Sequence, residues 1–333
     1  MSSAWRRLAP ASALLVVVAT LAGCGSGSGS AQPSGAASGS LMGTVDKNQI
    51  QPPSDDLLKV AGISKAEADK AVEISKSWNW QLVQVNGLVQ AVACTGTGSP
   101  TVVYSNGLIV PASWTWPIVV QKQSTTNRTC VFDRPGTGLS QARTSTSGNG
   151  PVANADEMLS AMATVGEKGP FVVVGWSYGG MIAQVAAASH PDVVSGVVLI
   201  DSVTPTQYRT FDKDGWNEGG ADLDMAAGEH AVAQPNWGQR PLASLIAGRE
   251  SADDAAEISQ TDWVKQSEQL AAHAPNHVVG IVKDAEHTIP QSDPDAVVAA
   301  TNAVLESIKS GQSLPACPST FATAGITCVK GSQ

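Results

Sequence analysis

Residues 171–184 read FVVVGWSYGGMIAQ, and this stretch decides the fold. Its first four residues are apolar and mostly β-branched, which predicts a short buried strand. After a sharp turn, Ala-rich sequence of good helix formers runs to about residue 189. The turn contains Gly175-x-Ser177-x-Gly179, in which two glycines leave room around a serine held in a strained conformation. The spacing predicts a nucleophile elbow, with the serine hydroxyl lifted out of the turn and the next backbone N–H free at a helix N-terminus.

The serine motif is weak as a pattern, because the chain contains 32 glycines and is also rich in serine. A glycine-rich turn with a solvated serine is the alternative interpretation. The strand before the motif and the helix after it favour the elbow, since this is the structural context that the motif requires.

The bulk composition is that of a globular protein. The chain has 333 residues, of which 42% are hydrophobic, so it is long enough to bury one large α/β core. The formal net charge is −9, and the basic footprint of a nucleic-acid-binding protein is missing. We expect a monomer with no nucleic-acid partner.

The first 23 residues have the pattern of a lipoprotein signal peptide. Arg6 and Arg7 precede an apolar run, residues 8–22, that is shorter than the ~20 residues of a membrane-spanning helix. The run ends in Leu-Ala-Gly-Cys24, which resembles a bacterial lipobox and predicts a lipid on Cys24. An ordinary signal cleaved nearby or a free cysteine is the alternative, and the arginine pair leaves Sec and twin-arginine export open. We expect an exported protein, either at the outer face of the cell membrane as a lipoprotein or secreted.

The rest of the chain divides into four parts. Residues 24–53 are predicted to be a flexible tether, rich in Gly, Ser and Ala at its start. Residues 54–79 contain a predicted helix from Asp55 to about Ser77, whose role the sequence does not show. Residues 80–310 alternate predicted strands with helices, and residues 311–333 are predicted to be a tail.

The region 80–310 has the pattern of a mostly parallel sheet covered on both faces. Asn86-Gly87 predicts an opening hairpin. Later strands alternate with helices, which favours parallel pairing. The predicted strands cover residues 81–85, 88–94, 101–104, 129–132, 171–174, 194–200, 241–247 and 277–282, and predicted helices cover about 153–165, 255–272 and 296–310 as well as the helix of the elbow.

Three motifs in this order resemble the α/β-hydrolase fold family. They are residues 133–140 (DRPGTGLS), residues 175–180 (GWSYGG), and His287 ahead of Pro294-Asp295. The likeness covers about residues 80–309 and implies a mostly parallel central sheet with helices on both faces and a short lid insert at about 203–240. The sequence departs from the family at Asn106-Gly107, where relatives usually have His-Gly.

A catalytic serine needs a base within hydrogen-bond reach, because its hydroxyl is a poor nucleophile at neutral pH. Of the five histidines, His287 follows the last predicted strand, where the family's order of serine, acid and histidine places the base. The resemblance thus implies Ser177 as nucleophile and His287 as base. The remaining histidines are better explained as structural or surface residues: His190, His230, His273 and His277.

The acid of the triad stays open between two positions. Relatives usually carry it a few residues after the strand at 241–247, where Glu250, Asp253 and Asp254 lie close to the expected place. The other location in the family is the end of the preceding strand, which is Asp201 here. We favour Asp201 over Glu250 on spacing alone, although an aspartate is also common there without a catalytic role.

The resemblance also implies two backbone N–H donors for an oxyanion. One belongs to Tyr178, which follows the nucleophile, and the other to Leu108 in the loop after the third strand. The Asn106 departure does not remove a backbone donor, so it need not abolish activity.

Four cysteines follow Cys24, and an even number in an exported protein suggests two disulfides. The second and fourth strands of the α/β-hydrolase fold are neighbours, so the resemblance implies a bond between Cys94 and Cys130. Cys317 and Cys328 are then left to close a small C-terminal loop.

The function that the resemblance implies is a serine hydrolase acting on a small-molecule ester, as carboxylesterases and lipases do, through Ser177, His287, Asp201 and an acyl-enzyme. An aminopeptidase-like amide hydrolase is one alternative, and a surface binding protein that kept the fold and lost catalysis is another. The sequence has no metal-ligand spacing, dinucleotide fingerprint or phosphate-binding loop, so we expect no metal and no cofactor.

Overall fold

The computed structural model describes residues 39–329, except 62, 144–147, 206, 208–215, 234–236, 250–257 and 322–323. The predicted signal peptide, Cys24 and the start of the tether therefore lie outside the described residues. The same is true of Glu250, Asp253 and Asp254. None of the helices in the described part of the chain is long and apolar enough to cross a bilayer.

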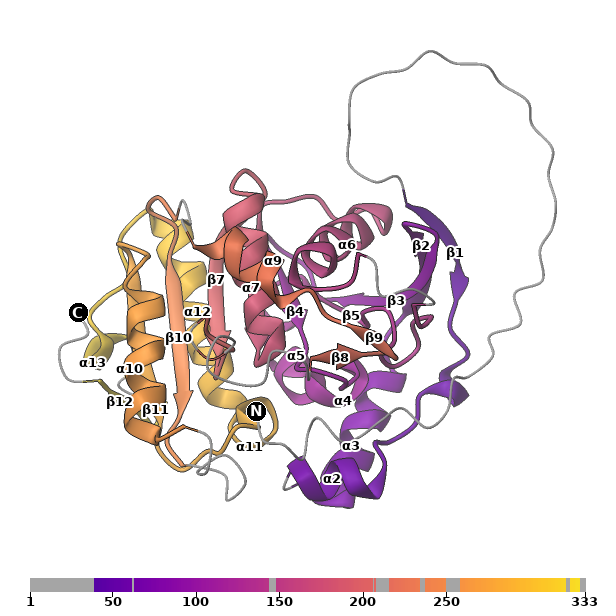
Figure 1. Ribbon diagram of the computed structural model, residues 1–333, viewed down its shortest axis with the longest axis horizontal. Helices are drawn as coiled ribbons and strands as arrows, with labels where there is room; N and C mark the ends of the chain where they lie inside the picture. Colours follow the sequence, from indigo (N-terminus) through magenta and orange to yellow (C-terminus); the bar gives the residue numbers. More distant parts are fainter. Residues whose placement is uncertain are drawn as a thin grey trace, which may run out of the picture.

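The described strands form a large sheet and one small hairpin (Figure 1). The large sheet contains β1 (Ser40–Thr44), β2 (Trp80–Val85), β3 (Leu88–Thr95), β4 (Thr101–Ser105), β5 (Thr129–Phe132), β6 (Phe171–Trp176), β7 (Val194–Ile200), β10 (Leu242–Ala247), β11 (His277–Val282) and β12 (Ile326–Cys328). Their spatial order is β1-β2-β3-β5-β4-β6-β7-β10-β11-β12. The six strands from β5 to β11 in that order are parallel, and the other pairs are antiparallel. The mostly parallel sheet that the sequence predicts is confirmed.

The strand order places helices on both faces of the sheet. The helices are α2 (Asp55–Ala61), α3 (Lys65–Lys76), α4 (Ala112–Thr115), α5 (Pro117–Gln123), α6 (Pro151–Thr164), α7 (Tyr178–Ser189), α9 (Met225–Val232), α10 (Gln260–Ala271), α11 (Ile289–Ser292), α12 (Pro294–Ser310) and α13 (Cys317–Thr320). Strand β5 lies on one side of β4, whereas β6 and β7 lie on the other. Because parallel crossovers are right-handed, α5 covers one face, and α6 and α7 cover the opposite face. Helix α12 packs against α5 and so shares its face (Figure 1).

The centre of the sheet is built from valine. Strands β4, β6 and β7 carry consecutive valines that are fully buried, because helices cover both faces there: Val102, Val103, Val172, Val173, Val174, Val197 and Val198. These strands are parallel, so their carboxyl ends meet at one edge of the sheet. The loops that leave this edge carry the residues of the candidate site.

The helical segment before the sheet differs from the single helix predicted for Asp55 to Ser77. The structure has two helices there, α2 and α3. Ser64 starts the second helix: its side chain accepts the Glu67 N–H, and the Glu67 carboxylate accepts the Ser64 N–H at 3.0 Å. This reciprocal capping box begins a new helix inside the apolar pattern that suggested one continuous helix.

Both edges of the sheet extend beyond the predicted domain limits. Strand β1 and a short 3-10 helix (Lys47–Gln49) lie within the predicted tether, and β1 pairs antiparallel with β2. Helix α13 and strand β12 lie within the predicted tail, and β12 pairs with β11. These short segments carry few apolar residues, so their pairing leaves little trace in the sequence.

The four cysteines that the structure describes form two disulfides, with the expected pairing. Cys94 and Cys130 face one another on the neighbouring strands β3 and β5, and they are bonded. The second disulfide, between Cys317 and Cys328, joins α13 to β12. The second bond therefore fixes the edge strand of the sheet to the helix before it.

The predicted lid insert contains a hairpin and a helix among its described residues. The hairpin consists of β8 (Asn217–Glu218) and β9 (Ala221–Asp222), and α9 follows it. Helix α9 packs against α6 and α7, so the insert covers that side of the sheet's carboxyl edge (Figure 1). We call the described residues between β7 and β10 the cap.

Candidate active site

Ser177 lies in a sharp turn between β6 and α7. Its backbone has φ 55° and ψ −122°, a strained combination for a residue other than glycine. Gly175 and Gly179 allow this turn, because a Cβ on Gly175 would overlap the Gly179 carbonyl and one on Gly179 would overlap the Ser105 carbonyl. The described geometry is therefore the strand–turn–helix arrangement that the sequence predicts around Ser177.

His287 lies within hydrogen-bond distance of Ser177. The ring Nε2 is 3.0 Å from the Ser177 Oγ, and the ring Nδ1 is 2.7 Å from Oδ2 of Asp201. An ionised carboxylate only accepts hydrogen bonds, so the proton between His287 and Asp201 belongs to Nδ1, and Nε2 is left to accept the serine proton. The structure thus brings together the serine, histidine and aspartate that the sequence analysis favours.

Asp201 is held as a carboxylate by three groups. Its Oδ1 accepts the Ala247 N–H at 2.9 Å and the Trp263 indole N–H at 2.8 Å, while Oδ2 faces His287. Burial opposes ionisation of this carboxyl, but the hydrogen bond to His287, the electrostatic attraction to its ring and the two N–H donors outweigh it. Together they hold the pKa of Asp201 below its usual value.

Two tryptophans support the histidine and the acid. The Trp176 indole donates to the backbone carbonyl of His287 at 2.7 Å, and the two rings are 5.3 Å apart. Trp263, on α10, donates to Asp201 as described above. Sequence reasoning missed both roles. Trp176 stands inside the serine motif and could have been suspected, whereas nothing local in the sequence links Trp263 to Asp201.

The two expected oxyanion donors come from adjacent segments. Tyr178 is the first residue of α7, so its N–H has no acceptor within the helix. Leu108 is buried in the loop after β4, and its N–H forms no hydrogen bond with any described residue. The start of α7 packs directly on this loop, since a Cβ on Gly179 would also touch the Asn106 carbonyl. A free N–H on each segment is what an oxyanion requires.

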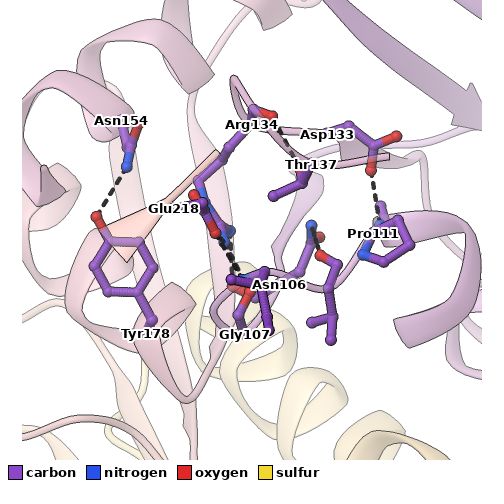
Figure 2. Close-up of polar contacts among 12 residues, drawn as sticks. Asn106, Gly107, Pro111, Asp133, Arg134, Thr137, Asn154, Tyr178 and Glu218 are labelled. Atoms are coloured by element: carbon purple, nitrogen blue, oxygen red, sulfur yellow. Dashed lines mark hydrogen bonds and ion pairs between the residues drawn. The ribbon is translucent and has the colours of Figure 1, made fainter. Parts of the chain in front are cut away.

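Residues 106–109, which we call the oxyanion loop, contact a buried ion pair. Arg134 donates to the carbonyls of Asn106 and Gly107, each at 2.7 Å. Its guanidinium also binds the Glu218 carboxylate, at 2.6 and 2.8 Å, and Figure 2 shows the two side chains meeting beside this loop. Arg134 comes from the loop after β5 and Glu218 from the cap. Neither role of these residues was expected from the sequence.

One cluster within the described residues has the spacing of a metal site: Cys94, Cys130 and Glu167. Both sulfurs are bonded to one another, so neither is a free thiolate ligand. The cluster also lies away from Ser177, at the end of β3 and the start of β5.

A model of the α/β-hydrolase fold family matches residues 100–245. A curated relative, an uncharacterised protein of Schizosaccharomyces pombe, is 40% identical over 75 residues, which are 22% of this chain and 14% of that protein. The chain therefore matches only a small part of that relative's length.

Solved structures have the same fold. Mouse α/β hydrolase domain-containing protein 10 aligns with a TM-score of 0.55 and 16% identity, over 69% of this chain and 99% of that one. A putative lipase from Acinetobacter baumannii aligns with a TM-score of 0.54 and 15% identity, over 73% and 96% of the two chains. At these identities the likeness concerns the fold alone. Together with the family match it confirms the α/β-hydrolase fold that the sequence motifs predict.

Proposed function

We propose that this chain, which has the α/β-hydrolase fold, is a serine hydrolase that cleaves a carboxylic ester through an acyl-enzyme. One observation carries the proposal: a strained serine at the start of a helix is hydrogen-bonded to a histidine, which is hydrogen-bonded to a buried carboxylate. Three side chains from three separate loops meet in the order that acyl transfer requires. The family and a neighbour named as a putative lipase support a hydrolase.

The first half-reaction forms the acyl-enzyme. The Ser177 oxygen attacks the carbonyl carbon of the ester while His287 Nε2 removes the serine proton. The N–H groups of Tyr178 and Leu108 bind the oxyanion of the tetrahedral intermediate. When this intermediate collapses, the bond to the alkoxide breaks and His287 gives its proton to the departing alcohol. The acyl group remains on Ser177.

The second half-reaction uses water as the nucleophile. His287 Nε2 takes a proton from water, and the hydroxide attacks the acyl carbon through the same oxyanion site. Collapse returns the proton to Ser177 and releases the carboxylic acid. Asp201 stays ionised through both half-reactions and stabilises the imidazolium that forms in each.

A carboxylic ester is a better candidate substrate than the N-terminus of a peptide. An aminopeptidase needs an accessible carboxylate for the substrate ammonium group. Glu218 in the cap is not accessible in this sense, because it is buried, both of its oxygens already bind Arg134, and one also accepts the Ile109 N–H. A binding protein without catalysis is disfavoured because it would have no need of a serine, histidine and carboxylate aligned at 3.0 and 2.7 Å.

The reaction is tested with two chromogenic substrates and one substitution. Wild-type protein should hydrolyse short-chain p-nitrophenyl esters faster than aminoacyl p-nitroanilides, and Ser177→Ala should abolish both activities. Ser310→Ala, on the exposed end of α12, is the matched control and should retain wild-type turnover. Equal ester hydrolysis by wild type and Ser177→Ala would contradict the proposal. Faster hydrolysis of the anilides than of the esters by the wild type would favour the aminopeptidase alternative.

We also propose that Cys24 carries a lipid that holds the enzyme at the outer face of the cell membrane. The Leu-Ala-Gly-Cys sequence after the apolar run supports this proposal. Stable anchoring needs two acyl chains or more, since a single chain binds membranes only reversibly. Expressed in a bacterium, the wild type should fractionate with membranes, and Cys24→Ser should be released or remain unprocessed. An intact mass with no lipid on Cys24 would contradict this proposal.

A further inference from the structure

Arg134 and Glu218 form an ion pair that is almost completely buried, with 0% and 1% of their side chains exposed. A buried ion pair is a poor source of stability, because the desolvation of both charges offsets most of their attraction. The pair therefore calls for an explanation other than stability. Its contacts supply one, since both residues hold the backbone of the oxyanion loop.

Three consecutive peptide groups of that loop are fixed by the pair. Arg134 binds the carbonyls of Asn106 and Gly107, and the Glu218 Oε1 accepts the Ile109 N–H at 2.8 Å. The Leu108 N–H belongs to the middle one of these three peptide groups, together with the Gly107 carbonyl, and is the proposed oxyanion donor. We propose that Arg134 and Glu218 are positioning residues that aim the Leu108 N–H at the oxyanion. The inference rests on the proposed hydrolase function.

The loop needs such support because its backbone is strained. Ile109 has φ 61°, a left-handed conformation that a β-branched residue rarely adopts. The bond from its N–H to Glu218 is made in this conformation. Without Glu218, the loop would be free to relax toward an ordinary conformation and turn its peptide groups away from the site.

Glu218 reaches the loop because the cap hairpin is seated on the loop after β5. Gly136 and Gly219 touch backbone to backbone, since a Cβ added to either would overlap the Cα of the other. Arg134 lies two residues before Gly136, and Glu218 lies directly before Gly219. The glycine contact and the ion pair therefore form one continuous joint between the two loops. The joint makes the oxyanion loop depend on the cap.

The two residues are not themselves available to a substrate. The Nε atom and both terminal nitrogens of Arg134 are engaged with Glu218 or with loop carbonyls. The positive charge is neutralised at contact distance, and the Arg134 guanidinium carbon also lies over the Tyr178 ring, 5.1 Å from its centroid. Their effect on catalysis must therefore pass through the loop.

A double substitution separates positioning from stability. In Arg134→Met/Glu218→Leu both charges are replaced by apolar side chains, a change that often leaves a protein equally stable or more stable. Here the Asn106 and Gly107 carbonyls and the Ile109 N–H lose their partners, so we expect a modestly lower Tm, and kcat is measured well below the Tm of the variant. With p-nitrophenyl acetate we expect kcat to fall on the order of 100-fold, as when an oxyanion donor is lost, with KM within about threefold.

The matched control is the pair Arg128 and Glu167. It has the same chemistry, since Arg128 binds Glu167 through two nitrogens and donates to the Gly96 carbonyl. It lies at the start of β5, the opposite edge of the sheet from Ser177. Arg128→Met/Glu167→Leu should leave kcat within about twofold of the wild type, because the pair does not touch the oxyanion loop. A folded Arg134→Met/Glu218→Leu enzyme with wild-type kcat would overturn the proposal.

Arg134→Lys keeps the test decisive if the double variant fails to fold. Lysine retains the charge next to Glu218 but has no planar fork to hold two carbonyls. We expect kcat to fall at least about tenfold while KM changes little. Wild-type kcat in a folded Arg134→Lys enzyme would contradict the positioning role.

A readout without catalysis distinguishes this inference from the proposed function. Amide hydrogen exchange should be faster at residues 108–110 in Arg134→Met/Glu218→Leu than in the wild type, and unchanged in the Arg128 and Glu167 control. Unchanged exchange at residues 108–110 in the double variant would overturn the inference. If Ser177→Ala keeps full activity, the proposed function fails, and the exchange result still decides whether the pair orders the loop.

Discussion

Nδ1 of His287 lies 2.7 Å from Oδ2 of Asp201, and the other oxygen of that carboxylate is occupied by N–H donors from Ala247 and Trp263. The sequence left the acid open between Asp201 and Glu250. The described residues bring Asp201 to the histidine, whereas Glu250 lies outside them. The arrangement also orients the carboxylate, because only one of its oxygens can face the imidazole.

Asp201→Asn should be nearly inactive although it keeps the shape of the side chain. The amide oxygen must face the N–H groups of Ala247 and Trp263, which leaves the amide NH₂ toward His287. The imidazole would then carry its proton on Nε2 and could not accept the proton of Ser177. We expect kcat for p-nitrophenyl acetate to fall on the order of 10⁴-fold. Glu250→Gln should keep most activity, and the reverse result would move the acid to Glu250.

Asp133 should make stability depend on pH. Burial raises its pKa to about 6, although the N–H groups of Leu139 and Ala112 favour the ionised form. In the unfolded chain the Asp133 carboxyl ionises near pH 4. Between about pH 4 and 6 this carboxyl is therefore more often protonated in the native state than in the unfolded state. The free energy of unfolding therefore falls as the pH rises through this window and is level above it.

Urea unfolding of the wild type and of Asp133→Asn at several pH values isolates this contribution. The variant is less stable at every pH, because its amide NH₂ faces an N–H donor in place of an acceptor. The advantage of the wild type over the variant should shrink on the order of 2 kcal/mol between pH 4 and pH 7. A difference that stays constant over this range would contradict the account of Asp133.

Removing the disulfide between Cys94 and Cys130 should lower stability more than removing the other one. Its loop is the longer, with a sequence separation of 36 between the cysteines against 11 for Cys317 and Cys328. Under a chain-entropy model we expect a loss of ~4 kcal/mol for Cys94→Ala/Cys130→Ala and ~3 kcal/mol for Cys317→Ala/Cys328→Ala. Denaturant unfolding measures both losses. Peptide mapping without reductant that finds Cys94 joined to Cys317 would contradict the pairing.

The parts of the fold that could be predicted are those that local patterns determine. The valine-rich strand, the glycines at 175 and 179 and the helix-forming sequence after them predict the elbow, because strand, turn and helix are the context that the serine motif requires. Asn86-Gly87 predicts a hairpin, and both residues do have positive φ, 52° and 81°. The positions of Ser177 and His287 follow from the same motifs and from chain order.

The parts that could not be predicted depend on contacts between distant residues. Trp263 meets Asp201 across 62 positions of sequence, and Arg134 meets Glu218 across 84. No periodicity or motif connects such partners, because their meeting is decided by how loops and cap fold over the finished sheet. The break between α2 and α3 was missed for a different reason, since the apolar pattern continues across the Ser64 cap.

Covalent labelling of Ser177 tests the central claim most directly. A fluorophosphonate reacts with a serine only where a base removes its proton and N–H donors stabilise the developing oxyanion. Intact-mass analysis should show one adduct per wild-type chain, peptide mapping should place it on Ser177, and Ser177→Ala should remain unlabelled. A wild-type chain that stays unlabelled, or whose adduct lies on another serine, would contradict the account of Ser177 as the nucleophile.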